Sequence, residues 1–419
     1  MTVSLCSPWN GGFQPPPARL KVTLEIIIIY SILKPKTMSK FSYLGNIAGL
    51  IFLLISCGRS ASENNTDIPD ILEIDYSGVK ANPAISELID TLEFIPLIGS
   101  IENPISRIDE LQIKNDRFFI LDKRRKEINV YNLDGSPCYK VANTGRAENE
   151  YLEIACFAVT DSSLLIADNY QSKINEYDAA DGKYLRTHRA PVVVGGIRPL
   201  QNGGFILAEL PVEGVNITDA SDGNRIYIVD KDFNVKDSYY PFGNTRDKYA
   251  MPSYFTGNDS TYVYASADFP GYTVIDASTG RRKGNVRIKT DNPLDQEAIA
   301  DVPLENAGDY IFENDLSILT STPRICGNYI LFNIKKGNDS PYSIYDAKSG
   351  NIYSNDPENY HNLLIAPHEA YDDSFFTVYN FGGNFLDQQL AMGFNPPSNV
   401  ADSIIRNNGA VVLRYRMKP

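Results

Sequence analysis

A repeating order of apolar and polar positions runs through most of the chain. Each copy has an apolar strand, a polar break, a second strand that ends in Asp or Asn, a turn with Gly or Asn, and a third strand of alternating character. Short apolar runs that end at turn residues are typical of β-strands. The clearest copies occupy residues 118–141, 164–186, 204–239, 262–288 and 328–353. The pattern therefore predicts an all-β fold built from one repeated unit.

The turns inside the copies carry the residues that a hairpin needs. Examples are Asp134-Gly135 and Asp181-Gly182, together with Gly280 and Gly350, which each follow an Asp by four residues. An Asp or Asn side chain can bond the backbone two residues later, and Gly adopts a positive φ without strain. Each copy is therefore expected to fold back as antiparallel strands.

The spacing of the copies is that of propeller blades. They recur every few dozen residues, as four-stranded blades do, and the longest gap carries 294–310 as an insertion. A sixth, weaker unit runs from 369 to 385. The strand-like sequences at 90–97 and 409–415 would each leave an exposed sheet edge if alone, so we expect them to share the last blade. The prediction is a six-bladed β-propeller of four-stranded antiparallel blades over residues 76–419, closed by pairing its N- and C-terminal strands.

The segment before the repeats has the order of a bacterial lipoprotein signal peptide. Met38-Ser39-Lys40 gives a basic start, residues 44–55 are apolar but too short to span a bilayer, and Ser56-Cys57 closes the run. This order predicts that Cys57 is lipidated. The alternative is a buried apolar strand with a chance cysteine.

The signal divides the first part of the chain into three regions. These are an upstream segment from a mis-assigned start at 1–37, the signal peptide at 38–56, and the lipidated Cys57 with a flexible polar tether to residue 75. Gly58 stands where an Asp would retain the protein in the inner membrane. We therefore expect an outer-membrane lipoprotein, on either the periplasmic or the cell-surface side.

Composition and charge narrow the classes of partner. The net charge is -13 and the basic residues are scattered, which argues against a nucleic-acid partner. The 26 Tyr and 19 Phe residues suit β-strands. Cys138, Cys156 and Cys326 remain in the propeller, an odd number. Cys138 and Cys156 each lie in an apolar run, where a buried free thiol is expected, and pairing between them stays open.

These features together resemble the six-bladed β-propeller lipoprotein family that is abundant in Bacteroidetes and related in fold to NHL and TolB-like propellers. Residues 85–97 resemble the first strands of that family. Gly145, Glu150 and Tyr151 match its Gly-x-Gly-Pro-Gly-Glu-Tyr segment, although 147–149 reads Ala-Glu-Asn in place of Gly-Pro-Gly. The resemblance covers nearly all of the mature chain and implies fold and compartment rather than an activity.

The loop that holds this segment is the candidate ligand site. Loops at one face of a propeller converge on its central opening, where ligands usually bind. Arg146, Glu148, Glu150 and Tyr151 are the predicted ligand-binding residues. The alternative is a solvated loop in which Glu150 bonds backbone amides and Tyr151 packs.

The remaining motifs predict no metal or cofactor site. His361 and His368 lie near Glu369, Asp372 and Asp373, but seven residues apart in a loop they lack the spacing of metal ligands, so no metal site is predicted. The chain has no phosphate-binding Gly-rich motif followed by Lys-Ser/Thr, no Gly-x-Ser-x-Gly and no Cys-x-x-Cys, and no cofactor is predicted. Catalytic residues stay unassigned.

Repeated acidic residues have a structural interpretation. Asp122 and Asp168 occupy equivalent places in the first two copies. Catalysis needs one constellation of groups, whereas a residue repeated in several blades is typical of a turn cap. We expect these two carboxylates to hold loops.

Three functions fit the sequence. The first is a monomeric, non-catalytic binding module that presents a propeller face to an envelope protein or a glycan. The second is a glycan hydrolase or lyase, which requires Glu148, Glu150 and the acidic residues of 369–373 to meet within about 5 to 10 Å. The third is an envelope scaffold.

Overall fold

The structure is a computed structural model. It describes residues 70–77, 82–210, 223–242, 254–258, 260–265, 269–294, 298–299, 301–303, 306–336, 342–355 and 363–419. The predicted upstream segment, signal peptide and lipidated Cys57 lie outside the described residues. No helix in the described ranges has the length and apolar character to cross a membrane.

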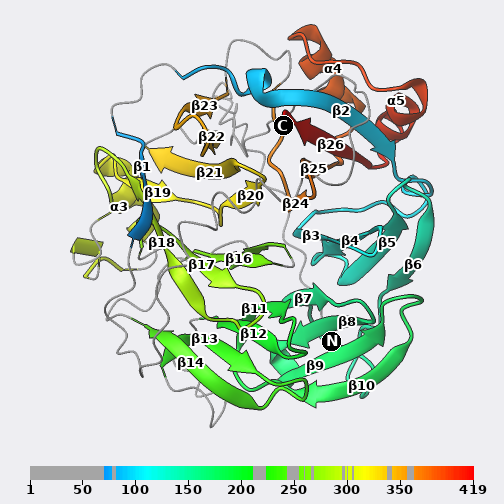
Figure 1. The fold of residues 1–419 in the computed structure, drawn as a ribbon. Coiled ribbons are helices and arrows are strands. Elements are labelled where there is room, and N and C mark those ends of the chain that lie inside the picture. Colours follow the sequence, from blue (N-terminus) through cyan, green and yellow to red (C-terminus); the bar gives the residue numbers. More distant parts are fainter. Residues whose placement is uncertain are drawn as a thin grey trace, which may run out of the picture.

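Six sheets, each built on an antiparallel blade, stand round a common centre, which confirms the predicted six-bladed propeller (Figure 1). We number these sheets as blades 1 to 6 in chain order, and each begins at its innermost strand. Blade 1 contains β3 (Glu110–Lys114), β4 (Arg117–Asp122), β5 (Glu127–Asn132) and β6 (Pro137–Val141). Blade 2 contains β7 (Cys156–Val159), β8 (Ser163–Asp168), β9 (Lys173–Asp178) and β10 (Tyr184–Arg189), with the short helix η2 (Asn169–Gln171) between β8 and β9. Blade 3 contains β11 (Val194–Pro199), β12 (Phe205–Glu209), β13 (Asn224–Val229) and β14 (Val235–Pro241).

The second half of the ring is less regular. Blade 4 contains β15 (Phe255–Gly257), β16 (Thr261–Tyr264), β17 (Gly271–Asp276) and β18 (Arg282–Lys289). Blade 5 contains β19 (Ser317–Leu319), β20 (Arg324–Cys326), β21 (Tyr329–Lys336), β22 (Tyr342–Asp346) and β23 (Ile352–Ser354). Blade 6 contains β24 (Glu369–Tyr371), β25 (Ser374–Tyr379), β26 (Val411–Met417) and β2 (Ile89–Pro96), which follows the short helix η1 (Ile85–Leu88). In blade 5 the inner strand is broken, because β19 and β20 pair with successive parts of β21.

The two ends of the propeller close the ring in blade 6, as the sequence predicts. Strand β2 runs antiparallel to β26 from Ile89 opposite Met417 to Pro96 opposite Val411. Figure 1 shows β2 at the outer edge beside the C-terminal strand. Each strand therefore covers a sheet edge that the other would leave open.

A second contact of the N-terminal part lies two blades away. Strand β1 (Asp70–Asp75) adds to the outer edge of blade 4 in parallel with β18. Farther along the chain, Asn82 donates to Ser354 Oγ of blade 5 at 2.6 Å, before β2 enters blade 6. The last six residues of the predicted tether are thus an ordered strand, and the N-terminal part of the described chain contacts three blades.

The apolar core lies between neighbouring blades. Inward residues of facing sheets form separate buried clusters, such as the contact of Phe118 in blade 1 with Phe376 in blade 6, whose ring centres are 5.9 Å apart. The turns follow the predicted chemistry. Gly182 has a φ of 73°, and the Asp178 carboxylate accepts from the backbone N–H of Ala180 at 2.6 Å. Side-chain alternation and local turn residues therefore define most strands.

Helical segments are inserted between strands of the second half. Helix α3 (Ala307–Glu313) lies between β18 and β19, within the longest gap of the repeat. Helices α4 (Gly383–Ala391) and α5 (Asn399–Arg406) lie between β25 and β26, and α5 contacts both β2 and β26. The Ser398 hydroxyl caps α5 by accepting from the N–H of Ala401 at 3.3 Å. We call α4 and α5 the blade-6 cap.

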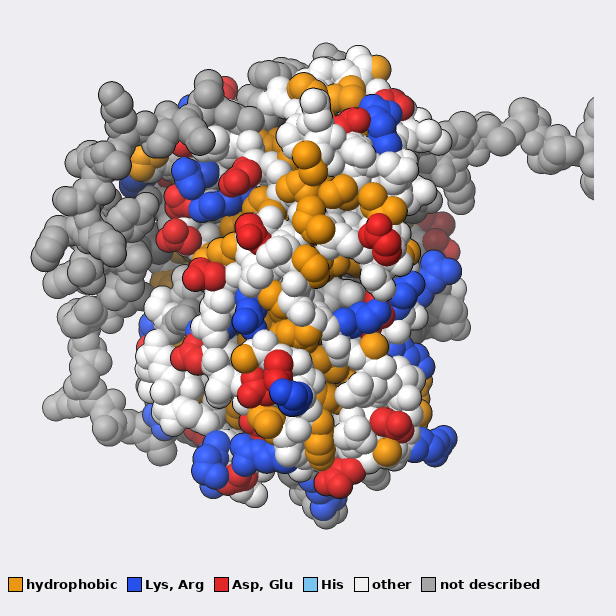
Figure 2. Space-filling model, turned by 90° about the vertical axis from the view of Figure 1, so that its right-hand side faces the viewer, with side chains coloured by type: hydrophobic (Ala, Val, Ile, Leu, Met, Phe, Trp, Pro, Cys, Tyr) orange, Lys and Arg blue, Asp and Glu red, His pale blue; other side chains and the backbone are white. Residues whose placement is uncertain are grey.

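Charges of both signs are mixed on the surface. Figure 2 shows the molecule from the side, turned by 90° from the view of Figure 1. Lys and Arg side chains are interspersed with Asp and Glu over this face, and apolar side chains lie between them. The described part of this face therefore has the scattered distribution of basic residues that the sequence indicates.

Candidate functional site

Four charged side chains from four inner strands meet near the centre of the ring. They are Glu110 on β3, Arg198 on β11, Arg324 on β20 and Glu369 on β24, and we call them the axial cluster. The inner strands contact one another in sequence round the centre. Charged groups withdrawn from water in this way require partners or shift their protonation.

Glu110 and Arg198 satisfy each other. Arg198 Nη1 lies 3.2 Å from Glu110 Oε1, and only 9% and 14% of the two side chains are exposed. Arg198 Nη2 also donates to the carbonyl of Phe255 at 2.8 Å. The Gln112 amide donates to the same Glu110 oxygen at 2.9 Å. This half of the cluster ties blades 1, 3 and 4 together.

Arg324, unlike Arg198, has no carboxylate partner among the described residues. Among the described residues its one hydrogen bond runs from Nη1 to the carbonyl of Thr322 at 3.5 Å, at the limit of a hydrogen bond. Its Nε is buried and has no partner in the described part of the chain. No described carboxylate lies within ion-pair distance of its guanidinium, although Glu369 is its strongest favourable charge. Burial lowers the pKa of Arg324, yet a guanidinium stays charged at physiological pH. The axis therefore holds a cation with spare donors.

Glu369 lies beside this cation without pairing to it. Within the described ranges its carboxylate accepts only the N–H of Ala370, at 2.8 Å. Burial raises the pKa of Glu369 to about 7, although Arg198 and Arg324 act in the opposite direction. The neighbouring His368 accepts from the N–H of Val378 through Nδ1 at 3.2 Å, and burial, reinforced by Arg324, lowers its pKa to about 3. At neutral pH the histidine is neutral and Glu369 is close to its own titration.

The predicted loop lies over blade 2 rather than at the centre. Arg146 and Glu148 are exposed, Glu150 is half-buried and Tyr151 is buried. The Glu148 carbonyl accepts from Lys173 on β9 and from Thr187 on the outer strand β10, at 3.2 and 3.0 Å.

Inside this loop, Glu150 and Tyr151 make structural contacts. Glu150 Oε2 accepts from the N–H of Ala147 at 2.8 Å. The Tyr151 hydroxyl donates to the carbonyl of Val141 at 3.2 Å. A Cβ at Gly145 would lie 1.9 Å from the Glu150 carboxylate, so a larger residue there would displace that side chain from its bond to Ala147. These contacts match the structural interpretation of the loop, and they leave Arg146 and Glu148 as its solvent-facing charges.

The carboxylates proposed to meet in an enzyme lie in different places. The contacts of Glu148 and Glu150 are in their own loop and blade 2, whereas Glu369 has Glu110 as its acidic neighbour. Asp372 lies at a turn with a φ of 55°, and Asp373 pairs with Arg416 at 3.1 Å. His361 lies outside the described residues. Within the described ranges no group of three His, Cys, Asp or Glu side chains is placed to hold a metal ion.

The repeated aspartates hold loops, as predicted. Asp122 accepts from the N–H of Ser106 at 2.6 Å and from the N–H of Arg125 at 3.0 Å. Asp168 accepts from the N–H of Leu152 at 2.7 Å, so each carboxylate binds the backbone sixteen residues earlier. Both fix the segment that leads into an inner strand.

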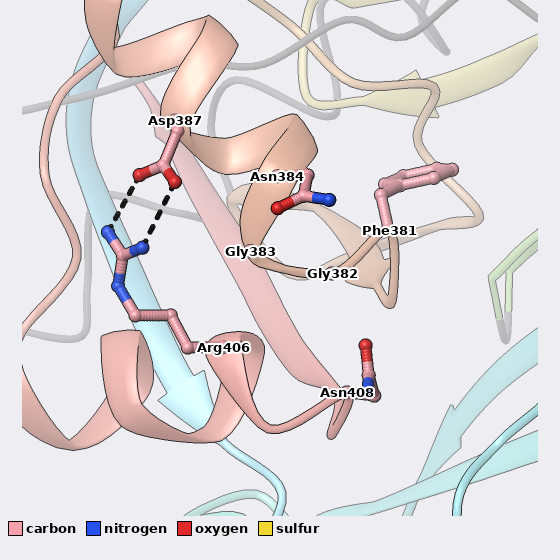
Figure 3. A pocket seen from close by; sticks show the side chains of 7 residues that line it. All are labelled: Phe381, Gly382, Gly383, Asn384, Asp387, Arg406 and Asn408. Carbon is pink, nitrogen blue, oxygen red and sulfur yellow. Dashed lines mark hydrogen bonds and ion pairs between the residues drawn. The ribbon is translucent and has the colours of Figure 1, made fainter.

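A second site candidate lies at the blade-6 cap. A hollow of about 390 Å³ lies between the start of α4 and the end of α5, and it is lined by Phe381, Gly382, Gly383, Asn384, Asp387, Arg406 and Asn408. Figure 3 shows the three side chains Phe381, Asn384 and Asn408 round the Gly382-Gly383 backbone, with the Asp387–Arg406 ion pair at one side.

Sequence reasoning missed the axial cluster. Its members lie in short inner strands. Glu110, Arg198 and Arg324 fall outside the predicted repeats, and Glu369 begins the predicted sixth unit but is grouped there with Asp372 and Asp373. The available signal was a single charged residue in a short apolar strand, as in the sequence Arg324-Ile325-Cys326. Such a residue in a buried strand implies a facing partner or a ligand.

Comparisons with known proteins identify relatives. The model of a family described as "Domain of unknown function (DUF4934)" matches residues 72–411. A comparison with curated proteins finds no match. A solved structure described as an exported protein of Bacteroides fragilis is similar, with 13% identity and a TM-score of 0.67, over 83% of this chain and 100% of that chain. A DUF4221 family member from Bacteroides vulgatus has 11% identity and a TM-score of 0.43, over 79% of this chain and 97% of that chain. At such identity the first likeness shows the fold alone.

Proposed function

We propose that this chain, which belongs to the DUF4934 family, is a non-catalytic binding module of the bacterial envelope, held at the outer membrane by a lipid on Cys57. Two observations support the location. The order of basic, apolar and small residues before Cys57 is that of a lipoprotein signal. The fold is also shared with a Bacteroides protein described as exported.

The ligand-binding role is carried by one observation, the Arg324 guanidinium at the centre of the ring, which has no counter-charge within ion-pair distance among the described residues. Arg324 is half-buried and its Nε is shielded from solvent. A cation so placed without a counter-charge is costly to maintain, and an anionic group bound there would offset the cost. The guanidinium offers planar, paired donors to a carboxylate, phosphate or sulfate. We therefore propose that an anionic group of the partner protein or glycan binds at Arg324.

Residues of the same end of the propeller would contact the rest of such a partner. Arg146 and Glu148 are exposed on the loop that leads into β7, the inner strand of blade 2. We propose that these two side chains meet the partner at the rim, while Glu150 and Tyr151 hold the loop in shape. The proposal needs no cofactor, metal or nucleic acid, and it takes the propeller as a monomer.

A glycan hydrolase or lyase is the second candidate. Glu369, with a pKa of about 7, is suited to general acid catalysis, and Glu110 is an ionisable neighbour. The binding role is preferred because Glu110 is already held by Arg198 and Gln112. Cleavage of envelope polysaccharide by the wild-type protein, lost in Glu369→Gln, would favour the enzyme instead.

The test is chemical crosslinking of the lipid-anchored protein in intact cells, followed by affinity capture and analysis of bound protein and sugar. Three forms are compared: wild type, Arg324→Gln and, as a matched loss of surface charge, Arg281→Gln. Arg281 is exposed at the hairpin before β18. We expect wild type and Arg281→Gln to capture the same partner and Arg324→Gln to lose it. Recovery of the wild-type protein alone, or equal capture by all three, would contradict the proposal.

A further inference from the structure

The hollow of the blade-6 cap combines one exposed aromatic ring with fixed polar groups. Phe381 lines the hollow and is 42% exposed, so part of its apolar surface is open to a ligand. Its ring is supported from behind by Tyr379, at 5.2 Å between ring centres, and by Phe385, at 5.5 Å. The ring is thus packed against two aromatic side chains, while part of its surface stays open at the hollow.

The polar wall is held in place by ion pairs. Arg406 Nη1 and Nη2 donate to the two oxygens of Asp387 at 3.2 and 2.9 Å. Arg406 Nε donates to Asp402 at 2.8 Å. All three nitrogens of the arginine therefore donate to a carboxylate, while each Asp387 oxygen keeps a second acceptor position. Two amides, Asn384 and Asn408, complete the wall with both donors and acceptors.

This combination has the chemistry of a sugar-binding site. A hexopyranose ring carries an apolar C–H face, which stacks on an aromatic ring, and hydroxyl groups at its edge, which pair with carboxylates and amides. The volume of about 390 Å³ is at the small end of ligand pockets and suits one or two sugar rings. The two carboxylates that share the single cation Arg406 leave a net negative charge, which disfavours an anionic ligand.

We propose that the blade-6 cap binds a neutral hexose, as a free sugar or the end of a glycan, with Phe381 as the stacking platform and Asp387 as the main hydroxyl acceptor. This site is separate from the axial cluster and goes beyond the proposed function. Sugar binding here is therefore expected to survive Arg324→Gln, so that failure of one proposal leaves the other standing.

The test uses tryptophan as a reporter at the platform. The one tryptophan of the sequence, Trp9, lies before the predicted signal peptide, so Phe381→Trp in the mature protein carries a single indole, in the hollow. A matched control, Phe312→Trp, places the indole on α3, where Phe312 is 46% exposed. Fluorescence is recorded while glucose, galactose, mannose, cellobiose and lactose are each titrated.

We expect a saturable change for at least one of these sugars in the Phe381→Trp reporter and none in the Phe312→Trp control. Asp387→Ala in the reporter background is expected to weaken binding about tenfold, the loss of one charge-assisted hydrogen bond, whereas Glu313→Ala, another exposed acid on a helix, leaves it unchanged. No response to any of the five sugars would overturn the proposal. Equal responses in the reporter and the control, or an Asp387→Ala variant that binds normally, would overturn it as well. Thermal unfolding of each variant confirms that the fold is retained.

Discussion

Replacing Glu369 by Gln is expected to remove a defined part of the pH dependence of stability. The pKa of Glu369 rises from 4.5 to about 7 on folding, because the carboxylate is buried. Between these values the folded state holds a proton that the unfolded state has released. The free energy of unfolding therefore falls as the pH rises from about 4.5 to about 7. At about 1.4 kcal/mol for each pKa unit, the loss is about 3 kcal/mol.

The measurement is urea unfolding of wild type and Glu369→Gln at several pH values from about 4.5 to about 8. Glutamine does not titrate, so the variant lacks this contribution. His368 acts with the opposite sign, since its lowered pKa makes stability rise with pH up to about 6.5, but it is present in both proteins and cancels in the difference. The stability of the variant relative to wild type should rise by about 3 kcal/mol across the range. If the free energies of unfolding of wild type and Glu369→Gln keep a constant difference across this pH range, the assignment of Glu369 as a buried, titrating acid is refuted.

Three further predictions test the fold. Asp122→Ala should lower the free energy of unfolding by about 2 to 4 kcal/mol, because it leaves several backbone N–H groups without a partner, whereas Asp134→Ala, at an exposed turn, should change it little in the same urea titration. Maleimide labelling of the native protein at about pH 8, mapped by mass spectrometry, should modify the half-buried Cys138 but spare Cys156, since burial raises the pKa of Cys156 to about 12; rapid labelling of Cys156 would show that blades 2 and 3 open readily. A chain that ends at residue 410 lacks β26 and leaves β2 unpaired, so it should lose the cooperative thermal transition by circular dichroism.

The blades could be predicted because their signals are local. A strand such as β4 carries its apolar character in the consecutive residues 118–121, and a turn such as Asp181-Gly182 carries its own hydrogen-bonding group and its own positive φ. The ring closure was also predictable, since the strand-like sequences at 90–97 and 409–415 would each leave an exposed sheet edge if unpaired.

The N-terminal strand was harder to predict. Residues 70–75 follow a polar stretch and are short, so the sequence reads as the end of a tether. Their strand conformation is stabilised by pairing with β18, which lies far along the chain, and by the ion pair of Asp75 with Lys289 at 2.8 Å. The same limit applies to the blade-6 cap, whose two short helices are stabilised by packing, with α5 lying on β2 and β26.

The axial cluster depends on long-range geometry in a similar way. Glu110 and Arg198 pair across 88 positions, and Arg324 and Glu369 come from two further blades. No spacing in the sequence records which side of an inner strand faces the centre. The predicted loop, in contrast, was recognisable from 145–151 alone, and the structure explains its Gly145 and Glu150 by their mutual contact.

The most direct test of the central proposal is anion binding at Arg324. Thermal unfolding is measured for wild type, Arg324→Gln and Arg281→Gln in sulfate and in chloride at equal ionic strength. An anion that occupies the axis stabilises the folded protein by about 1.4 kcal/mol at about ten times its Kd. We predict that the increase in Tm from chloride to sulfate is larger for wild type and Arg281→Gln than for Arg324→Gln. An equal effect of sulfate on all three proteins would contradict the proposal that the propeller axis is a ligand-binding site.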